Sequence, residues 1–293
     1  MKKLFKLGIF LLIMATVLGT SLSQAFNSAT HIYIADRVFP CTFDKINLYY
    51  GSIAPDIPLY ADLNKWPLGF CETHYKFIKL PYLWWKMSQK AFAQGWWTHN
   101  EEGGADSFAH GTCDTFEYCC QMDCGYEYGY VNIQAWTLKD IVGLKGIALD
   151  FELAHFAIEV AIDLLLIDDV TKDPHLGHKL LKAALFRSPV DFNLMTKVFV
   201  GKLGYGTDLE TFSSAESTFR NLVIRYALAL TLREPLRMAV LGELGVEVAD
   251  GMGVQIDSAT VQEILKTAMI LCYKTDYYDT IQLAIDEIKN NPY

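Results

Sequence analysis

The chain has 293 residues, of which 52% are hydrophobic and 20% are charged. This composition excludes wholesale disorder, which requires low hydrophobicity and high charge. Only the N-terminus carries an uninterrupted apolar run, which excludes a membrane protein with several spans. The formal net charge of −9 disfavours nucleic acid as a partner, because an acidic surface attracts phosphates poorly.

The first 25 residues have the composition of a targeting segment. Lys2, Lys3 and Lys6 precede an apolar stretch over 7–18, and a small-x-small cleavage motif ends at Ala25. These features predict a signal peptide over 1–25 and a secreted or periplasmic protein whose mature chain begins at Phe26. The alternative is an uncleaved membrane anchor.

The mature chain shows apolar residues at a period of 3.6, which predicts helices rather than strands. Ser28 or Thr30 caps the first expected helix, which Pro40 ends, and Asp257 or Ser258 caps another over 259–273. The other expected helices cover about 84–99, 145–167, 174–187, 190–203, 212–244 with a kink or break at Pro235, and 277–290. Segments 40–83 and 100–135 are expected to be irregular. Since no linker or repeat is evident, we expect a single all-α domain over 26–293 with a Cys-rich irregular insertion.

Four of the seven cysteines lie within twelve residues, and an exported protein favours disulfides over a thiolate zinc site. The odd number leaves at least one thiol unpaired or paired between chains. The seven are Cys41, Cys71, Cys113, Cys119, Cys120, Cys124 and Cys272.

Two pairs of potential metal ligands have helical spacing. Asp106 and His110 are four residues apart, as are His155 and Glu159, and Asp163 follows four residues later. Residues four apart share one face of a helix, so each pair could hold one ion. The 145–167 helix is otherwise apolar and should be buried, where polar groups need partners. A metal ion satisfies such groups, and a buried His–Glu hydrogen bond is the alternative.

Three further positions extend this set of ligands. Asp56 lies in the turn GSIAPDIP, where an Asx-turn role is the alternative. His74 in CETHYKF and His99 in GWWTHNEE lie beside bulky aromatic residues. For any one of these histidines a role as a hydrogen-bonded core residue is the alternative. Together the residues supply imidazole nitrogens and carboxylate oxygens without thiolates, which is typical of zinc sites.

Five short segments occur in the order FNSATHIYIADRVF, GSIAPDIP, THYKF, GWWTHNEEGGADSFAHG and HFAIEVAID. Together they resemble the bacterial zinc-dependent phospholipase C family, which is related to the three-zinc single-strand nucleases. The resemblance covers about 26–165, roughly half of the mature chain. It implies an all-helical domain that holds two to three zinc ions. The implied ligands are the α-amino group and carbonyl of Phe26 with His31, then Asp56, His74 and His99, with Asp106 as a bridge, and finally His110, His155 and Glu159.

The sequence departs from the family pattern at two places. The mature chain begins with Phe26 where the family usually has Trp, which leaves the amino group unaffected. The family's bridging Asp usually follows the His of its third motif by four residues, whereas Asp106 follows His99 by seven. Position 103 is Gly and cannot ligate through a side chain. We expect Asp106 to bridge, because its spacing to His110 fits the DxxxH form common in the family, and Glu102 is the alternative.

The resemblance implies that a metal-activated water hydrolyses phospholipid to diacylglycerol and a phosphorylated headgroup. The phospholipid could lie at a membrane surface. The resemblance also gives Asp56 a second role as a general base. Nearby aromatic residues could contact acyl chains or hold a quaternary ammonium group, with core packing as the alternative. They are Trp66, Phe70, Tyr75, Trp84, Trp85, Trp96 and Trp97.

Two other functions stay open on the sequence. One is a three-zinc single-strand nuclease or phosphatase, but the APD context of Asp56, Glu159 as the last ligand and the negative charge favour the phospholipase. The other is a non-catalytic, zinc-stabilised binding protein. No protein partner is evident.

Overall fold

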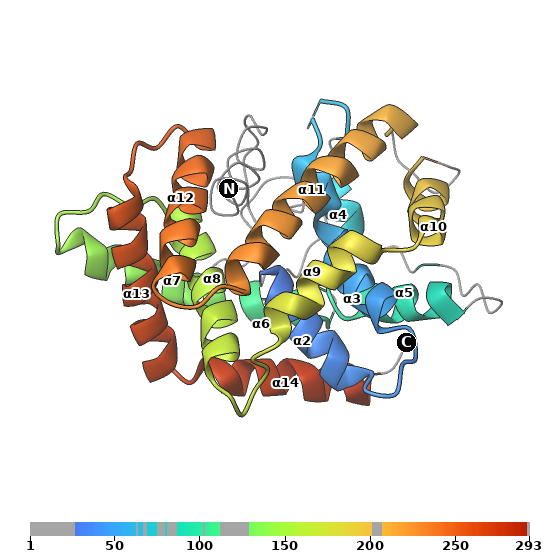
Figure 1. The fold of residues 1–293 in the computed structure, drawn as a ribbon, viewed down its shortest axis with the longest axis horizontal. Helices are drawn as coiled ribbons and strands as arrows, with labels where there is room; N and C mark the ends of the chain where they lie inside the picture. Colours follow the sequence, from blue (N-terminus) through green and yellow to red (C-terminus); the bar gives the residue numbers. More distant parts are fainter. Residues whose placement is uncertain are drawn as a thin grey trace, which may run out of the picture.

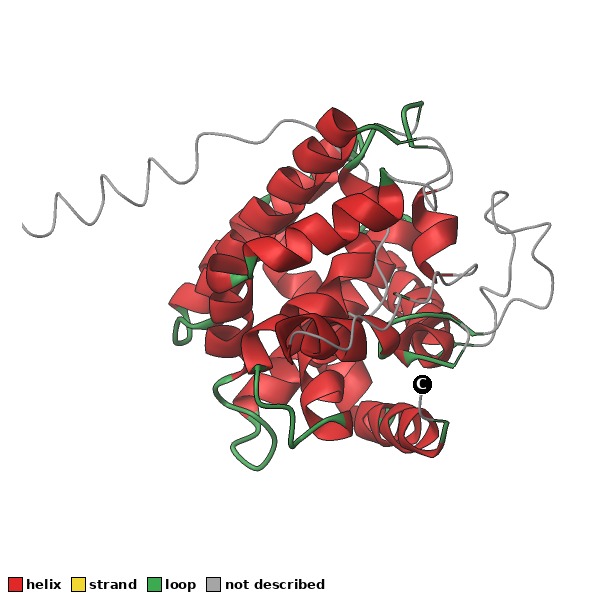
Figure 2. Cartoon of the chain, turned by 90° about the vertical axis from the view of Figure 1, so that its right-hand side faces the viewer, coloured by secondary structure: helices red, strands yellow, loops and turns green. Residues whose placement is uncertain are grey.

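The computed structural model describes residues 27–62, 64–66, 69–74, 80, 87–101, 103–111, 129–200 and 207–291. Within these ranges there are thirteen α-helices, one 3-10 helix and no strand, which confirms the expected all-α fold (Figure 2). No helix in the described ranges is both long and apolar enough to cross a membrane. The expected signal peptide, Phe26, Glu102 and the Cys-rich stretch 113–124 lie outside the described residues. Of the cysteines described, Cys41 is exposed and Cys272 is buried, and both are free thiols.

The expected long helices are present, with shifted ends. The expected 145–167 helix begins only at Phe151, because Asp150 caps it by accepting a hydrogen bond from the N–H of Leu153 at 2.8 Å. The expected break near Pro235 is confirmed, since one helix ends at Leu230 and the next begins at Leu236. The long helices are α5 (Met87–Trp97), α7 (Tyr130–Gly143), α8 (Phe151–Asp168), α9 (Leu176–Phe186), α10 (Pro189–Phe199), α11 (Leu209–Leu230), α12 (Leu236–Gly251), α13 (Ser258–Lys274) and α14 (Tyr277–Asn290), in addition to α2 (Ser28–Val38).

The expectation that 40–83 and 100–135 are irregular is wrong for much of their described residues. They contain α3 (Lys45–Ile53), η1 (Ala54–Tyr60), α4 (Gly69–His74) and α6 (Ala105–His110), and also residues 130–135 of α7, a helix that was not expected. These elements are short, and isolated helices of this length are marginal in water. Packing stabilises them, since α3 contacts α2, α5 and α9, and η1 contacts α4 and α11.

Helix α8 is largely buried, with thirteen of its eighteen residues in the interior. Figure 1 shows α7, α12 and α13 near one end of the molecule and α3, α5 and α10 near the other, while α14 runs beneath α2 and α6. The side chains of His155, Glu159 and Asp163 therefore lie in the interior, as the apolar character of their helix predicted.

Helices α3 and α5 cross at two glycines. A Cβ atom at Gly95 would lie 1.9 Å from the carbonyl oxygen of Leu48, and one at Gly51 would lie 2.1 Å from that of Phe92. Only glycine permits backbones to approach so closely. The crossing brings the end of α5, which leads into His99, against Ser52 of α3.

Candidate metal centre

The structure brings the eight described members of the predicted ligand set into three groups. Within each group the potential ligand atoms lie within 4.8 Å of one another. The residues come from five helices and one turn, so that only the tertiary fold assembles them. The groups are His31, His99 and Asp106, then Asp56, His74 and His99, and finally His110, His155 and Glu159.

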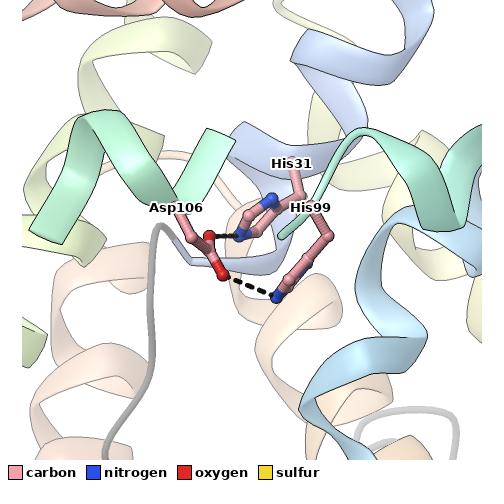
Figure 3. A group of neighbouring side chains, drawn as sticks. All are labelled: His31, His99 and Asp106. Atoms are coloured by element: carbon pink, nitrogen blue, oxygen red, sulfur yellow. Dashed lines mark ion pairs between the residues drawn. The ribbon is translucent and has the colours of Figure 1, made fainter. Parts of the chain in front are cut away.

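Asp106 lies between the first two groups. Its Oδ1 is 3.3 Å from Nε2 of His31, and its Oδ2 is 3.1 Å from Nε2 of His99 (Figure 3). The same Oδ2 is 3.5 Å from Nε2 of His74. The rings of His31 and His99 stack with their centroids 3.9 Å apart. One carboxylate thus faces both groups, which is the arrangement that a bridging ligand requires.

The turn before α6 explains how Asp106 reaches this position despite its spacing from His99. Gly103 has φ of 115°, and a Cβ atom at Gly104 would lie 2.5 Å from the carbonyl oxygen of Asn100. The chain therefore folds back on itself, and the N–H of Asp106 donates to the carbonyl oxygen of His99 at 2.9 Å. The glycine turn accommodates the three residues by which the spacing from His99 to Asp106 exceeds that of the family pattern.

In the second group two imidazoles direct the same kind of nitrogen atom at each other. The Nε2 atoms of His74 and His99 are 3.1 Å apart. Nδ1–H of His99 donates to the carbonyl oxygen of Ser52 at 2.7 Å, and Nδ1–H of His74 donates to that of Phe70 at 3.1 Å. In the neutral rings the lone pairs of the two Nε2 atoms then point at each other. Oδ1 of Asp56 lies 3.3 Å from Nε2 of His99 and 3.5 Å from Nε2 of His74. Such a set is repulsive unless a cation or proton lies within it.

The third group is oriented by a residue that the sequence analysis did not select. Glu101 accepts a hydrogen bond from Nδ1–H of His110 at 2.5 Å, which leaves Nε2 of His110 to act as a ligand. Nε2 of His155 lies 2.9 Å from Oε1 of Glu159. A carboxylate behind a histidine is the usual support for a metal-ligating imidazole. The signal in the sequence was the pair of glutamates after His99, of which only Glu102 was considered.

Burial and mutual charge shift the pKa values of these groups. Burial works to lower the pKa of His99, but Asp106 and Asp56 outweigh it and raise that pKa well above its usual value. Burial works to raise the pKa of Asp56, but His99 and His74 lower it to about 2. Burial, followed by the charges of Asp56 and Asp106, raises the pKa of Glu159 well above its usual value. The negative charges of Asp56 and Asp106 therefore disfavour ionisation of Glu159, whereas the positive charge of the histidines favours ionisation of Asp56.

The residues present fit a bound metal ion. Within the described part of the chain, both carboxylate oxygens of Asp106, Oε2 of Glu159 and Nε2 of His110 are buried and have no hydrogen bond of ordinary geometry. Buried polar atoms normally have such partners. The donor set combines five imidazoles with three carboxylates and no thiolate, which suits zinc and other first-row divalent ions.

The structure describes four of the seven aromatic residues expected to contact substrate, and it places them in different surroundings. The other three, Tyr75, Trp84 and Trp85, lie outside the described residues. Trp66 and Trp96 are 1% and 0% exposed, and their rings pack on Phe199 with centroids 5.1 Å and 5.6 Å apart. They form part of the core and have no exposed surface for a substrate. Phe70 is partly buried and stacks on the ring of His74 at 3.9 Å, and Trp97 is partly buried against the core.

Comparisons with known proteins add no family to this description. A scan of the chain against protein-family models found no match, and neither did searches of curated proteins and of solved structures. The fold and the site together define an all-α protein with three groups of histidine and carboxylate side chains, each of which could hold a metal ion.

Proposed function

We propose that the protein is a secreted or periplasmic zinc-dependent phosphodiesterase of the phospholipase C type, which hydrolyses phospholipid to diacylglycerol and a phosphorylated headgroup. One observation carries the proposal: the carboxylate of Asp106 faces His31 on one side and His74 and His99 on the other. This arrangement supports two neighbouring ions, and closely spaced metal pairs are typical of phosphoester hydrolysis. The lipid substrate follows from the resemblance of the sequence motifs.

The three groups would hold the ions, and the remaining residues would prepare them. Zinc bound there would supply Lewis acidity, which activates water at neutral pH and neutralises charge on phosphoryl oxygens. Because His99 and His74 hold the pKa of Asp56 near 2, Asp56 is a carboxylate at neutral pH. This is the form that ligates a metal ion. A carboxylate with so low a pKa is a weak base towards water, so this pKa favours Asp56 as a ligand over Asp56 as the general base.

Aromatic residues lead from the surface to the third group. His110 is the most exposed ligand in the described set, at 12% of its side chain. The ring of Phe151 meets His155 edge-on with centroids 5.8 Å apart, and Trp136, which is 47% exposed, packs on Phe151 at 4.8 Å. Lys139 places its ammonium 4.8 Å from the Trp136 ring. Apolar rings beside a positive charge suit the acyl chains and phosphate of a phospholipid.

The first test is the metal content of the processed protein, with its N-terminal residue sequenced from the same sample. We expect two or three zinc ions per chain that begins with Phe26. The same sample is then assayed on a chromogenic phosphocholine ester and on single-stranded DNA. Cleavage of the ester alone supports the proposal, and cleavage of DNA alone would favour the nuclease. A correctly processed chain without stoichiometric metal would overturn the metal-dependent function.

Substitutions on α8 separate catalysis from folding. We expect Glu159→Ala and His155→Ala to lower phosphodiesterase activity by orders of magnitude while helical circular dichroism is largely retained. His178→Ala is the matched control, because this exposed histidine on α9 lies outside the three groups. Unfolding of both α8 variants, without activity in the wild type, would instead support a structural role for the bound metal.

A further inference from the structure

Asp163 lies one helical turn after Glu159 on α8 and is completely buried. Its Oδ1 accepts hydrogen bonds from the N–H of Thr30 at 2.7 Å and from the hydroxyl of Thr30 at 2.5 Å. Its Oδ2 accepts hydrogen bonds from the hydroxyl of Tyr226 at 2.9 Å and from the N–H of Ala29 at 3.3 Å. One carboxylate therefore joins three helices, α2, α8 and α11.

These four contacts exclude Asp163 from the set of ligands. An ionised carboxylate offers about four acceptor positions, and all of them are engaged here. The spacing of Asp163 from Glu159 places it on the ligand-bearing stripe of α8, but its oxygens face the start of α2. Asp163 therefore acts on the metal centre through the residues that donate hydrogen bonds to it.

The groups that it holds are buried donors in the first turn of α2. The first four N–H groups of an α-helix have no partner within the helix, and a negative charge at this end is favourable. Asn27 caps Ser28 from within the chain, with Oδ1 2.8 Å from its N–H. Asp163, which is 133 residues from Thr30 in the sequence, accepts from the next two donors, the N–H groups of Ala29 and Thr30. It shares the N–H of Thr30 with the carbonyl oxygen of Asn27, which lies 2.9 Å from the same nitrogen.

His31 directly follows Thr30, so the same contact fixes the origin of the His31 side chain. Helix α8 carries His155 and Glu159 and is held by the core on almost all sides. The Asp163–Thr30 contact thereby ties the helix of one ligand group to the helix of another. We propose that Asp163 is a positioning residue, which sets His31 for metal binding by anchoring the first turn of α2 to α8. This inference rests on the metal centre of the proposed function.

Substitutions at both ends of the contact test the inference. Asp163→Asn replaces one acceptor oxygen by a donor that faces another donor. Thr30→Val removes the hydroxyl at nearly constant volume, and Thr30→Ser restores it. Val248→Ala on α12 is a control for general destabilisation, because it truncates a buried side chain outside the three groups. The full processed chain is stripped of metal and titrated with Zn²⁺, and with Co²⁺ to follow the visible absorption of each site.

We expect Asp163→Asn and Thr30→Val to lower the affinity for one metal ion by tenfold or more, and to leave the affinities for the other ions unchanged. One component of the Co²⁺ absorption spectrum should change as well. Thr30→Ser should recover the wild-type affinity, and Val248→Ala should leave all affinities unchanged. If folded Asp163→Asn and Thr30→Val bind every ion as the wild type does, the inference is overturned. An equal loss of affinity at every site in Asp163→Asn and Thr30→Val would also overturn it, as would the same loss in the Val248→Ala control. If Asp163→Asn fails to fold, the Thr30→Val and Thr30→Ser pair decides.

The same experiment separates this inference from the proposed function. A wild-type chain that binds metal with the expected variant effects but cleaves no phosphodiester would support the anchor and contradict the phosphodiesterase. A wild-type chain that binds no metal would overturn both.

Discussion

Glu101 accepts a hydrogen bond from Nδ1–H of His110 at 2.5 Å, while its own backbone N–H donates to the carbonyl oxygen of His74 at 3.0 Å. One residue thus orients a ligand of the third group and contacts the backbone of a ligand of the second. Carboxylates behind ligating histidines fix the ring orientation and raise its basicity.

We therefore expect Glu101→Gln to weaken metal binding at the third group by about 10–100-fold, because an amide orients the imidazole less strongly than a carboxylate. Competition with a chromogenic chelator measures the change. Glu210→Gln, at an exposed glutamate in the first turn of α11, is the control. Unchanged affinity in Glu101→Gln would show that His110 is held by other contacts.

The α3–α5 crossing predicts a large difference between two glycine substitutions. Gly95→Ala would place a Cβ atom 1.9 Å from the carbonyl oxygen of Leu48, so the helices must separate. We expect a loss of about 1–3 kcal/mol or more in the free energy of unfolding. Gly143→Ala, with no atom within 4 Å of its Cβ position, should be neutral or stabilising by up to about 1 kcal/mol.

Chemical denaturation of the two variants measures this difference. Because Ser52 accepts the hydrogen bond from His99, separation of α3 and α5 should also weaken metal binding in Gly95→Ala. Equal stability of Gly95→Ala and Gly143→Ala would contradict the close crossing of the helices.

The aromatic residues beside the third group predict an effect on substrate binding. Trp136→Ala removes an exposed ring that packs on Phe151, and we expect KM for a phospholipid substrate to rise about 2–10-fold with little change in zinc content. Steady-state kinetics on short-chain lipid measures KM. Tyr273→Ala, at an exposed aromatic residue of α13, serves as control. An equal effect of both substitutions would argue for nonspecific lipid contact.

Asp191 predicts a pH dependence of stability that is independent of the metal centre. Burial, together with the nearby charge of Asp44, raises the pKa of Asp191 to about 8 in the folded chain. Unfolding returns it to an ordinary value near 4. Between these two values the folded state holds a proton that the unfolded state releases, so stability falls as pH rises from about 4 to 8.

Asp191→Asn should remove this contribution, which amounts to at most about 1.4 kcal/mol per pH unit. The variant should therefore gain stability relative to the wild type as pH rises from 5 to 8. Denaturant unfolding at several pH values gives the difference. The exposed Asp140→Asn variant is the control. Parallel pH profiles for the wild type and Asp191→Asn would show that Asp191 titrates normally.

The sequence by itself determined the features that depend on local pattern. The apolar residues over 145–167 predicted a buried helix, and Pro235 predicted the break between α11 and α12. Asp257 or Ser258 was the expected cap of a helix, and the side chain of Asp257 caps α13 by accepting from the N–H of Thr260 at 2.7 Å. For α2 the expected cap, Ser28 or Thr30, is wrong, because Asn27 caps this helix. These properties follow from periodicity, from the missing N–H of proline and from capping by a nearby side chain, so a short window of residues contains the information.

Only the tertiary structure decided which residues of distant segments meet. The short helices α3, α4 and α6 form because neighbours bury them, so their own sequences predict them poorly. Trp66 and Trp96 pack in the core although the sequence did not distinguish this from substrate contact. The contacts of Glu101 with His110 and of Asp163 with Thr30 depend on how separate helices are placed. The sequence shows which side chains could ligate a metal ion. The distances between these side chains, which decide whether they form a site, depend on the packing of helices that are far apart in the sequence.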